Sequence, residues 1–173
     1  FDGDGDLDIL ATNGDKGEFD TPPRRDHGVR IYLNDGENKF AERWFFPMSG
    51  AYRAVSEDFD GDGDRDIAAV SYFPDYKSSP RESFVYLENQ GDYKFKPSTI
   101  KECIAGRWIT LDAGDIDGDG DKDIVLGAVK IGPRDVPPFL AEAWNRSGLT
   151  VLILENTFKK KSAPPKLLLP TSK

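Results

Sequence analysis

The sequence DFDGDGDRD, residues 58–66, decides the fold because the chain holds three copies of it in one register. A second full copy, DIDGDGDKD, occupies 115–123, and a copy without its first position, FDGDGDLD, occupies 1–8. The copies are offset by 58 and then 57 residues. A constant period of this length is typical of repeat architectures, in which each unit buries its faces against its neighbours.

Short strands are predicted around each loop. A run, VRIYLNDGENKF at 29–40, recurs as FVYLENQGDYKF at 84–95, and its first half recurs as VLILEN at 151–156. Its two halves are predicted to form two strands joined by a turn. Apolar, β-branched runs follow the loops, as expected for buried strands, and further strands lead into them. These runs are 7–12, 67–73 and 124–129 after the loops, and 52–57 and 108–113 before them.

We therefore predict an all-β fold, a partial β-propeller of four-stranded antiparallel blades, with the acidic loop between the first two strands of each blade. The predicted units are a partial blade at 1–48, a complete blade at 49–102, a third blade at 103–158 and a Lys- and Pro-rich tail at 159–173. A closed propeller needs at least about four blades, so we expect a fragment of a longer propeller. The one predicted helical turn is PFLAEAWNR, 138–146.

The charge of the chain argues against nucleic acid as a partner. There are 31 acidic and 23 basic residues, for a formal net charge of -8, whereas phosphate binding needs a concentrated basic patch. Fourteen of the 31 acids lie in the three loops, so one divalent cation per loop would remove much of the excess. No run approaches the roughly 20 apolar residues of a membrane span. The single cysteine, Cys103, excludes an internal disulfide and is predicted to be buried.

The loop chemistry points to calcium, which takes six to eight oxygen ligands. In the copy at 58–66, carboxylates fall at positions 1, 3, 5 and 9, and the glycines between them allow a sharp turn. We expect side-chain oxygens from Asp58, Asp60 and Asp62, the backbone carbonyl of Asp64, and the carboxylate of Asp66. The matching positions are Asp115, Asp117, Asp119, Asp121 and Asp123 in the third copy and Asp2, Asp4, Asp6 and Asp8 in the first. Two complete calcium sites and one incomplete site are predicted.

Two alternatives compete with this prediction. The EF-hand has the same first positions, but it requires a glutamate at position 12 and flanking helices. Position 12 is Ala69 in the second copy and Leu126 in the third, and both fall in predicted strands. An isolated Asp-Gly cluster can also be a solvated turn. Three copies in register, each with crowded like charges, favour a bound cation.

The D-x-D-G-D-G-x-x-D loop between strands, repeated about every 57 residues over the region 1–158, resembles the FG-GAP or VCBS repeat family. The resemblance implies a calcium-stabilised β-propeller, like the head of integrin α subunits. It also implies an extracytoplasmic protein, secreted, periplasmic or on the cell surface. Such modules bind other proteins or glycans, or serve as accessory domains of larger enzymes.

Long connections on the face opposite the loops form the predicted ligand face. They are 13–28, 74–83 and 131–149, and long loops on a rigid scaffold are where binding usually resides. An acidic or sugar ligand could be held there by cationic and aromatic side chains, although packing on a neighbouring blade would explain them equally well. The candidates are Arg24, Arg25, His27, Tyr76, Arg81, Arg134, Phe139 and Trp144.

Two function classes follow. The first is a non-catalytic binding or scaffolding module for a protein or polysaccharide ligand, in contact with neighbouring blades or domains of its parent chain. The second is an accessory or catalytic part of a larger carbohydrate-active or redox enzyme. No nucleophile motif of the G-x-S-x-G type occurs, and His27, the only histidine, is expected to be structural. We therefore favour the first class and predict no catalytic residue.

Overall fold

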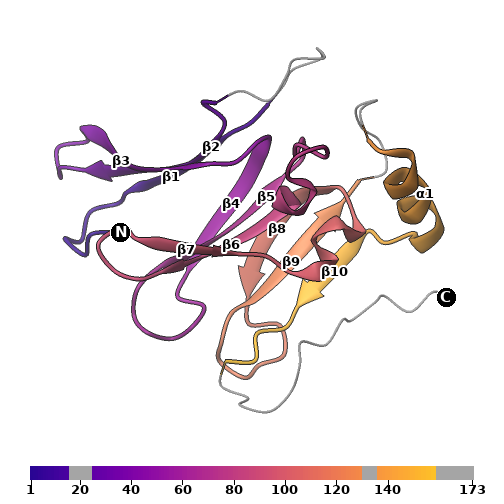
Figure 1. The fold of residues 1–173 in the computed structure, drawn as a ribbon. Coiled ribbons are helices and arrows are strands. Elements are labelled where there is room, and N and C mark those ends of the chain that lie inside the picture. Colours follow the sequence, from indigo (N-terminus) through magenta and orange to yellow (C-terminus); the bar gives the residue numbers. More distant parts are fainter. Residues whose placement is uncertain (16–24, 130–135, 159–173) are drawn as a thin grey trace.

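The computed structural model describes residues 1–15, 25–129 and 136–158. Within these residues, ten strands form three antiparallel sheets that follow one another along the chain (Figure 1). The first sheet contains β1 (Ile9–Asn13), β2 (Gly28–Asn34) and β3 (Phe40–Pro47). The second contains β4 (Ala51–Glu57), β5 (Asp66–Ser71), β6 (Phe84–Asn89) and β7 (Phe95–Ser98). The third contains β8 (Trp108–Gly114), β9 (Asp123–Ala128) and β10 (Val151–Leu154).

The predicted fold class is confirmed, since the described residues are nearly all β, in open antiparallel sheets that fit a partial propeller. The three sheets contain three, four and three strands in the described residues, and the sequence predicts the first as a partial blade and the second as the complete one. A fourth strand for the last sheet would fall on 159–173, outside the described residues. The blade boundaries at 48/49 and 102/103 stay a prediction.

The short helices lie in the connections. The α-helix α1 (Pro138–Ser147) contains the predicted helical turn and ends at Gly148, which has a φ of 62°. Two 3-10 helices, η1 (Pro80–Ser83) and η2 (Lys101–Ala105), precede β6 and β8. In the described part of the chain, no helix is long and apolar enough to cross a membrane.

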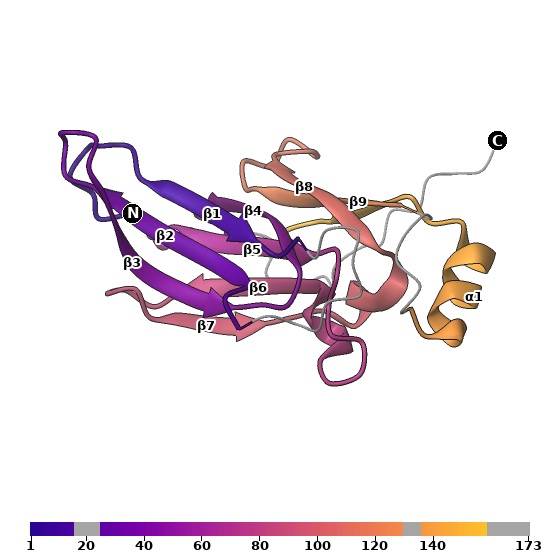
Figure 2. The same cartoon turned by 90° about the horizontal axis from the view of Figure 1, so that it is seen from above.

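The middle sheet has a hydrophobic core on both of its faces. Every residue of β5 is buried, and its side chains alternate between the two cores, as the period of two in a strand requires. Ile67 and Ala69 pack toward the first sheet, and Ala68 and Val70 toward the third. Figure 2 shows the sheets stacked in chain order, so burial between sheets rather than within one sheet stabilises the fold.

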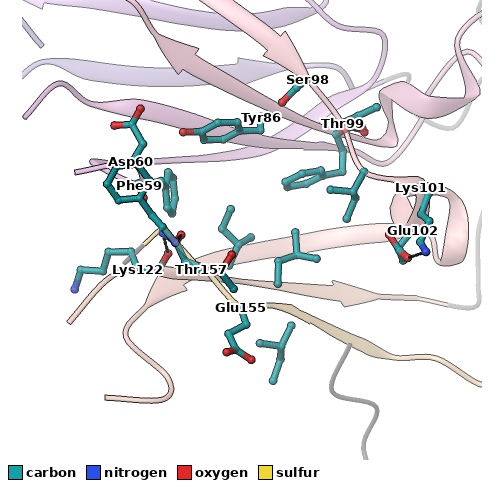
Figure 3. A pocket seen from close by; sticks show the side chains of 17 residues that line it. Phe59, Asp60, Tyr86, Ser98, Thr99, Lys101, Glu102, Lys122, Glu155 and Thr157 are labelled. Atoms are coloured by element: carbon teal, nitrogen blue, oxygen red, sulfur yellow. Dashed lines mark hydrogen bonds and ion pairs between the residues drawn. The ribbon is translucent and has the colours of Figure 1, made fainter. Parts of the chain in front are cut away.

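The two intersheet cores are filled differently. Between the first and second sheets, the rings of Trp44 and Phe95 are 4.5 Å apart. Between the second and third sheets, Trp108, Leu126 and other apolar side chains form the core, but a groove of about 540 Å³ remains beside it. Figure 3 shows Phe59 and Tyr86 on one side of this groove and Lys122 and Glu155 toward the other.

Candidate metal centres

The loop 58–66 joins β4 to β5, the first two strands of the second sheet. Gly61 and Gly63 have φ values of 77° and 98°, a conformation that residues with a Cβ rarely adopt, and so they permit the tight turn. The carboxylate of Asp58 accepts hydrogen bonds from the backbone N–H groups of Gly61 at 2.7 Å and Gly63 at 3.1 Å. These two hydrogen bonds hold the backbone of the loop in a turn around the Asp58 carboxylate.

Three carboxylates of this loop converge on one point. Asp58, Asp60 and Asp62 each offer an oxygen, and these oxygens all lie within 4.8 Å of one another. Calcium–oxygen distances are about 2.3 to 2.6 Å, so two oxygens on the same ion are at most about 5 Å apart. The spacing of the three carboxylates therefore fits a single calcium ion.

The electrostatics of the loop also favour a bound cation. Burial raises the pKa of Asp60, and the negative charges of Asp66, Asp62 and Asp58 raise it further. Within the described residues, none of Asp58, Asp60 and Asp62 forms an ion pair with a basic side chain. Among the described residues, these three negative charges therefore lie close together and are not neutralised by an ion pair with a basic side chain.

The loop 115–123 repeats this arrangement between β8 and β9. Asp115 accepts hydrogen bonds from the backbone N–H groups of Gly118 at 2.7 Å and Gly120 at 3.1 Å. Here the three clustered oxygens belong to Asp115, Asp117 and Asp123. Asp119 and Asp121 lie in the same loop, and Asp121 is buried, with 8% of its surface exposed.

The loop 1–8 has the same turn without the first carboxylate. Gly3 and Gly5 have φ values of 78° and 98°, and the backbone N–H of Asp6 donates to Asp4 at 2.9 Å. Asp2 accepts from the N–H of Asp4 at 3.2 Å. Among the described residues, a cluster of three metal-ligand oxygens forms in the other two loops and not in this one. Phe1 corresponds to Phe59 and Ile116, the second positions of the complete copies, so the sequence contains no residue equivalent to Asp58 and Asp115.

The last aspartate of each loop lies at or just before the start of one strand and is hydrogen-bonded to the end of the next strand. Asp66 is fully buried, and its carboxylate accepts hydrogen bonds from the backbone N–H of Phe59, the hydroxyl of Tyr86 and the backbone N–H of Asn89. Burial raises the pKa of Tyr86 above its usual range, and the hydrogen bond to Asp66 adds to this shift. The corresponding bonds to an asparagine N–H are Asp8 to Asn34 at 3.0 Å, Asp66 to Asn89 at 2.8 Å and Asp123 to Asn156 at 2.8 Å.

These asparagines are site residues that the sequence prediction missed. The signal was present, because VRIYLN, FVYLEN and VLILEN all end in asparagine. The Asn89 side chain donates to the carbonyl of Arg65 at 3.1 Å and accepts from the N–H of Gly91 at 3.0 Å. Each asparagine thus links the acidic loop to the end of a neighbouring strand in the same sheet.

Asn156 also links two acidic loops. Its side-chain amide donates to the carbonyl of Lys122 at 3.2 Å, within its own loop, and to the carbonyl of Phe59 at 2.6 Å, in the loop of the preceding sheet. The loops 58–66 and 115–123 therefore share one side chain.

The members of the predicted ligand face differ in their exposure. The rings of Tyr76 and Trp144 lie together, 6.2 Å apart between centres. His27 is buried, with 4% of its surface exposed, at the start of β2. The remaining described candidates, Arg25, Arg81 and Phe139, are exposed, and Arg24 and Arg134 lie outside the described residues. Among the described candidates, Tyr76 and Trp144 are the pair whose side chains are in contact, and a shared ligand face stays a prediction.

A stack of antiparallel sheets built from one repeat, with acidic glycine loops between successive strands, defines a repeat module of the β-propeller type. The chain belongs to the FG-GAP-like repeat family, whose model matches residues 1–69 and again residues 58–126. This match confirms the resemblance to FG-GAP repeats. No curated protein and no solved structure matches the chain.

Proposed function

We propose that this chain is a calcium-stabilised, non-catalytic binding or scaffolding module, with one calcium ion in each of the loops 58–66 and 115–123. The observation that supports it is the convergence of three carboxylate oxygens within 4.8 Å in each loop. Oxygen ligands at this spacing suit calcium, and none of the clusters contains a cysteine or histidine that would favour a transition metal.

Named residues of each loop would hold the ion. Asp58, Asp60 and Asp62 would supply side-chain oxygens in the first complete loop, with the carbonyl of Asp64 as a further ligand. Asp66 has both oxygens engaged by backbone and tyrosine donors, so we assign it chiefly to hold the loop on its sheet. In the second complete loop, Asp115, Asp117 and Asp123 converge. Both oxygens of Asp123 accept backbone N–H groups, as those of Asp66 do, so we assign Asp123 chiefly to hold the loop on its sheet. Asp115, Asp117 and Asp119 would then supply the side-chain oxygens.

The role of the ion would be structural. Each loop connects the first two strands of a sheet, and its carboxylates repel one another without a cation. An ion that binds the folded loop and not the unfolded chain contributes its binding free energy to folding. Calcium would therefore stabilise the sheets, and the long connections at their opposite ends would be left to bind a partner.

We place the module outside the cytoplasm, on a secreted or surface protein, with a protein or polysaccharide ligand. FG-GAP-like repeats are typically non-catalytic modules of extracellular proteins. Calcium modules of that compartment work with dissociation constants of about 10⁻⁴ to 10⁻³ M, for which exposed loops such as these are adequate.

Calorimetric titration of the full chain with calcium tests this proposal. We expect two ions per chain in the wild type and none in the double variant Asp60→Asn, Asp117→Asn. A matched control carries one neutralised acid outside the loops, Glu142→Gln on α1, and should still bind two. If the double variant binds two ions, the ligand assignment is wrong; if the wild type binds none, the calcium proposal itself is wrong.

A further inference from the structure

The groove between the second and third sheets is a hollow in an otherwise packed interface. It has a volume of about 540 Å³, with β6 and the end of β7 on one side and β9 and β10 on the other (Figure 3). Protein interiors are close-packed, so an apolar hollow of this size needs an occupant. The apolar residues that line it are Phe59, Phe84, Tyr86, Ile100, Ile124 and Leu154.

The interface between the first and second sheets shows what fills the equivalent position there. The fourth strand of the second sheet, β7, pairs with β6 and places the Phe95 ring 4.5 Å from that of Trp44 in the first sheet. In the third sheet β10 stands where β6 stands in the second, because Asn156 and Asn89 end matching runs and make the same bond to the last aspartate of their loops. A strand added to β10 would therefore turn side chains toward the second sheet, into the groove.

The strand β10 offers an open edge for such an addition. It lies at the edge of its sheet in the described part of the chain. The N–H of Ala128 donates to the carbonyl of Thr150 at 2.8 Å, and hydrogen bonding alternates along an antiparallel pair. The N–H groups of Val151 and Ile153 therefore point away from β9, toward the open edge. Exposed strand edges readily pair with a further strand.

The chain itself leads into this groove. Phe158, the last described residue, lines it, and a Cβ on Gly61 would meet the Phe158 ring at 3.3 Å. The tail 159–173 that follows contains three leucines, 167–169, before a proline. Proline is tolerated in edge strands, and β7 contains Pro97. The eight residues 159–166 can span about 26 Å, roughly twice the length of β10, which is enough to turn and return along that strand.

The charge of the tail complements that of the groove. The tail has five lysines and no acidic residue. The rim of the groove carries Asp60, Glu102 and Glu155, and it adjoins the acidic loop 58–66. Its two lysines are Lys101, which pairs with Glu102 at 3.5 Å, and Lys122. A basic segment is therefore favoured at this rim over an acidic one.

We propose that residues 166–170, KLLLP, add to the open edge of β10 as a fourth strand, and that Leu167 and Leu169 fill the groove. Side chains two residues apart in a strand lie on the same face, so these two leucines enter together and Leu168 faces away. The groove is then a docking site for the chain's own tail rather than a ligand pocket. The proposal does not depend on calcium, because none of its contacts involves a metal.

The test is hydrogen exchange of the full chain, followed by NMR at the amides of Val151 and Ile153. In wild type these amides should exchange about tenfold or more slowly than in the double variant Leu167→Ser, Leu169→Ser, because the variant loses the strand that covers them. The matched control Leu7→Ser, Phe139→Ser removes two apolar side chains that are 86% and 65% exposed, and it should exchange like wild type. Slow exchange of the β5 amides in all three proteins reports that the fold is intact.

A second measurement needs no variant. In wild type, nuclear Overhauser contacts should join the methyl groups of Leu167 and Leu169 to the rings of Phe59 or Tyr86. The fluorescent probe 1-anilinonaphthalene-8-sulfonate should bind the double variant and not wild type, since the tail would occupy the groove.

Several outcomes would overturn the proposal. They are fast exchange of the two β10 amides in wild type, equal exchange in wild type and the double variant, absence of the Overhauser contacts, and equal binding of the probe by both proteins. Protection that rises with protein concentration, with a dimer mass in sedimentation, would place the segment in the groove of a second copy and exclude docking within one chain.

Discussion

The two ends of the strands are built on different principles. At one end, the short loops 58–66 and 115–123 repeat the same residues, the same positive φ glycines and the same hydrogen bonds to their first carboxylate. At the other end, the connections differ in length and sequence, and a buried arginine, Arg107, lies among aromatic rings. The repeated end thus has the same local structure in each sheet, whereas the varied end differs from one sheet to the next.

Calcium should produce the largest of the predicted changes in stability, because it would bind at both loops of the repeated end. Each site would add about 2.7 kcal/mol at a calcium concentration 100 times its dissociation constant. For a chain of this size, two such sites should raise Tm by about 10 °C or more over the value in chelator. Scanning calorimetry in the two buffers measures the difference, and identical midpoints would contradict a calcium role at that end.

The variant Asp66→Ala should cause the second largest loss of stability, and this loss should also be seen when a chelator has removed calcium. It removes a fully buried acceptor of three hydrogen bonds and leaves the N–H groups of Phe59 and Asn89 unsatisfied. We expect a loss of about 3 kcal/mol or more in urea unfolding. The control Asp64→Ala changes an exposed carboxylate of the same loop and should leave the chelator midpoint nearly unchanged. Equal midpoints for the two variants would mean that Asp66 is only a ligand.

The asparagines allow a finer comparison within the repeated end. Asn89→Ala should lower the free energy of unfolding by about 1 kcal/mol, because its side chain donates to Arg65 and accepts from Gly91, both at one loop and its adjacent turn. Asn156→Ala should lower it by about 2 kcal/mol, because its amide donates to Phe59 and Lys122. Urea unfolding of both variants gives the values. A smaller loss for Asn156→Ala would rule out a link between the loops.

Arg107 at the varied end should have the smallest effect on stability. Arg107→Met removes a buried charge whose Nε and Nη2 have no hydrogen-bond partner among the described residues, so the free energy of unfolding should stay the same or rise by about 1 kcal/mol. Arg53→Met is the matched control, because Nε of Arg53 donates to the carbonyl of Leu111 at 2.5 Å and its loss should destabilise by about 1 kcal/mol. A large loss for Arg107→Met would make this residue structural and remove the contrast between the two ends.

The repeated end could be predicted from sequence because its determinants are local. Within nine residues, 58–66 holds the carboxylates and the glycines that turn the chain. Strand alternation and the turn at 35–36 are local as well, and the sheets follow from them. The bond from Asn89 to Asp66 joins residues 23 apart, yet it was detectable because its pattern recurs.

The varied end could not be predicted because its contacts are distant and occur once. Tyr72 and Trp144 are each more than 30 residues from Arg107 in sequence, in connections that do not repeat. Arg107 stands before a strand, and nothing in its neighbours shows that rings enclose it. The sequence predicts His27 to be structural, and it is buried, but the sequence does not show which residues pack on it.

The shared amide of Asn156 has a consequence for how the two ions bind. The Asn156 amide donates to the carbonyl of Phe59 in one loop and to that of Lys122 in the other. An ion that orders one loop would therefore also fix the position of Asn156, and Asn156 would in turn help to order the other loop. The second ion then meets a loop whose ordering entropy is already lost, and the two binding events become positively cooperative. We expect a calcium titration with a Hill coefficient above unity that Asn156→Ala returns to unity; independent sites in the wild type would exclude this. Two cooperative sites would fill over a narrower range of calcium concentration than two independent sites, so the two loops would gain or lose their order together.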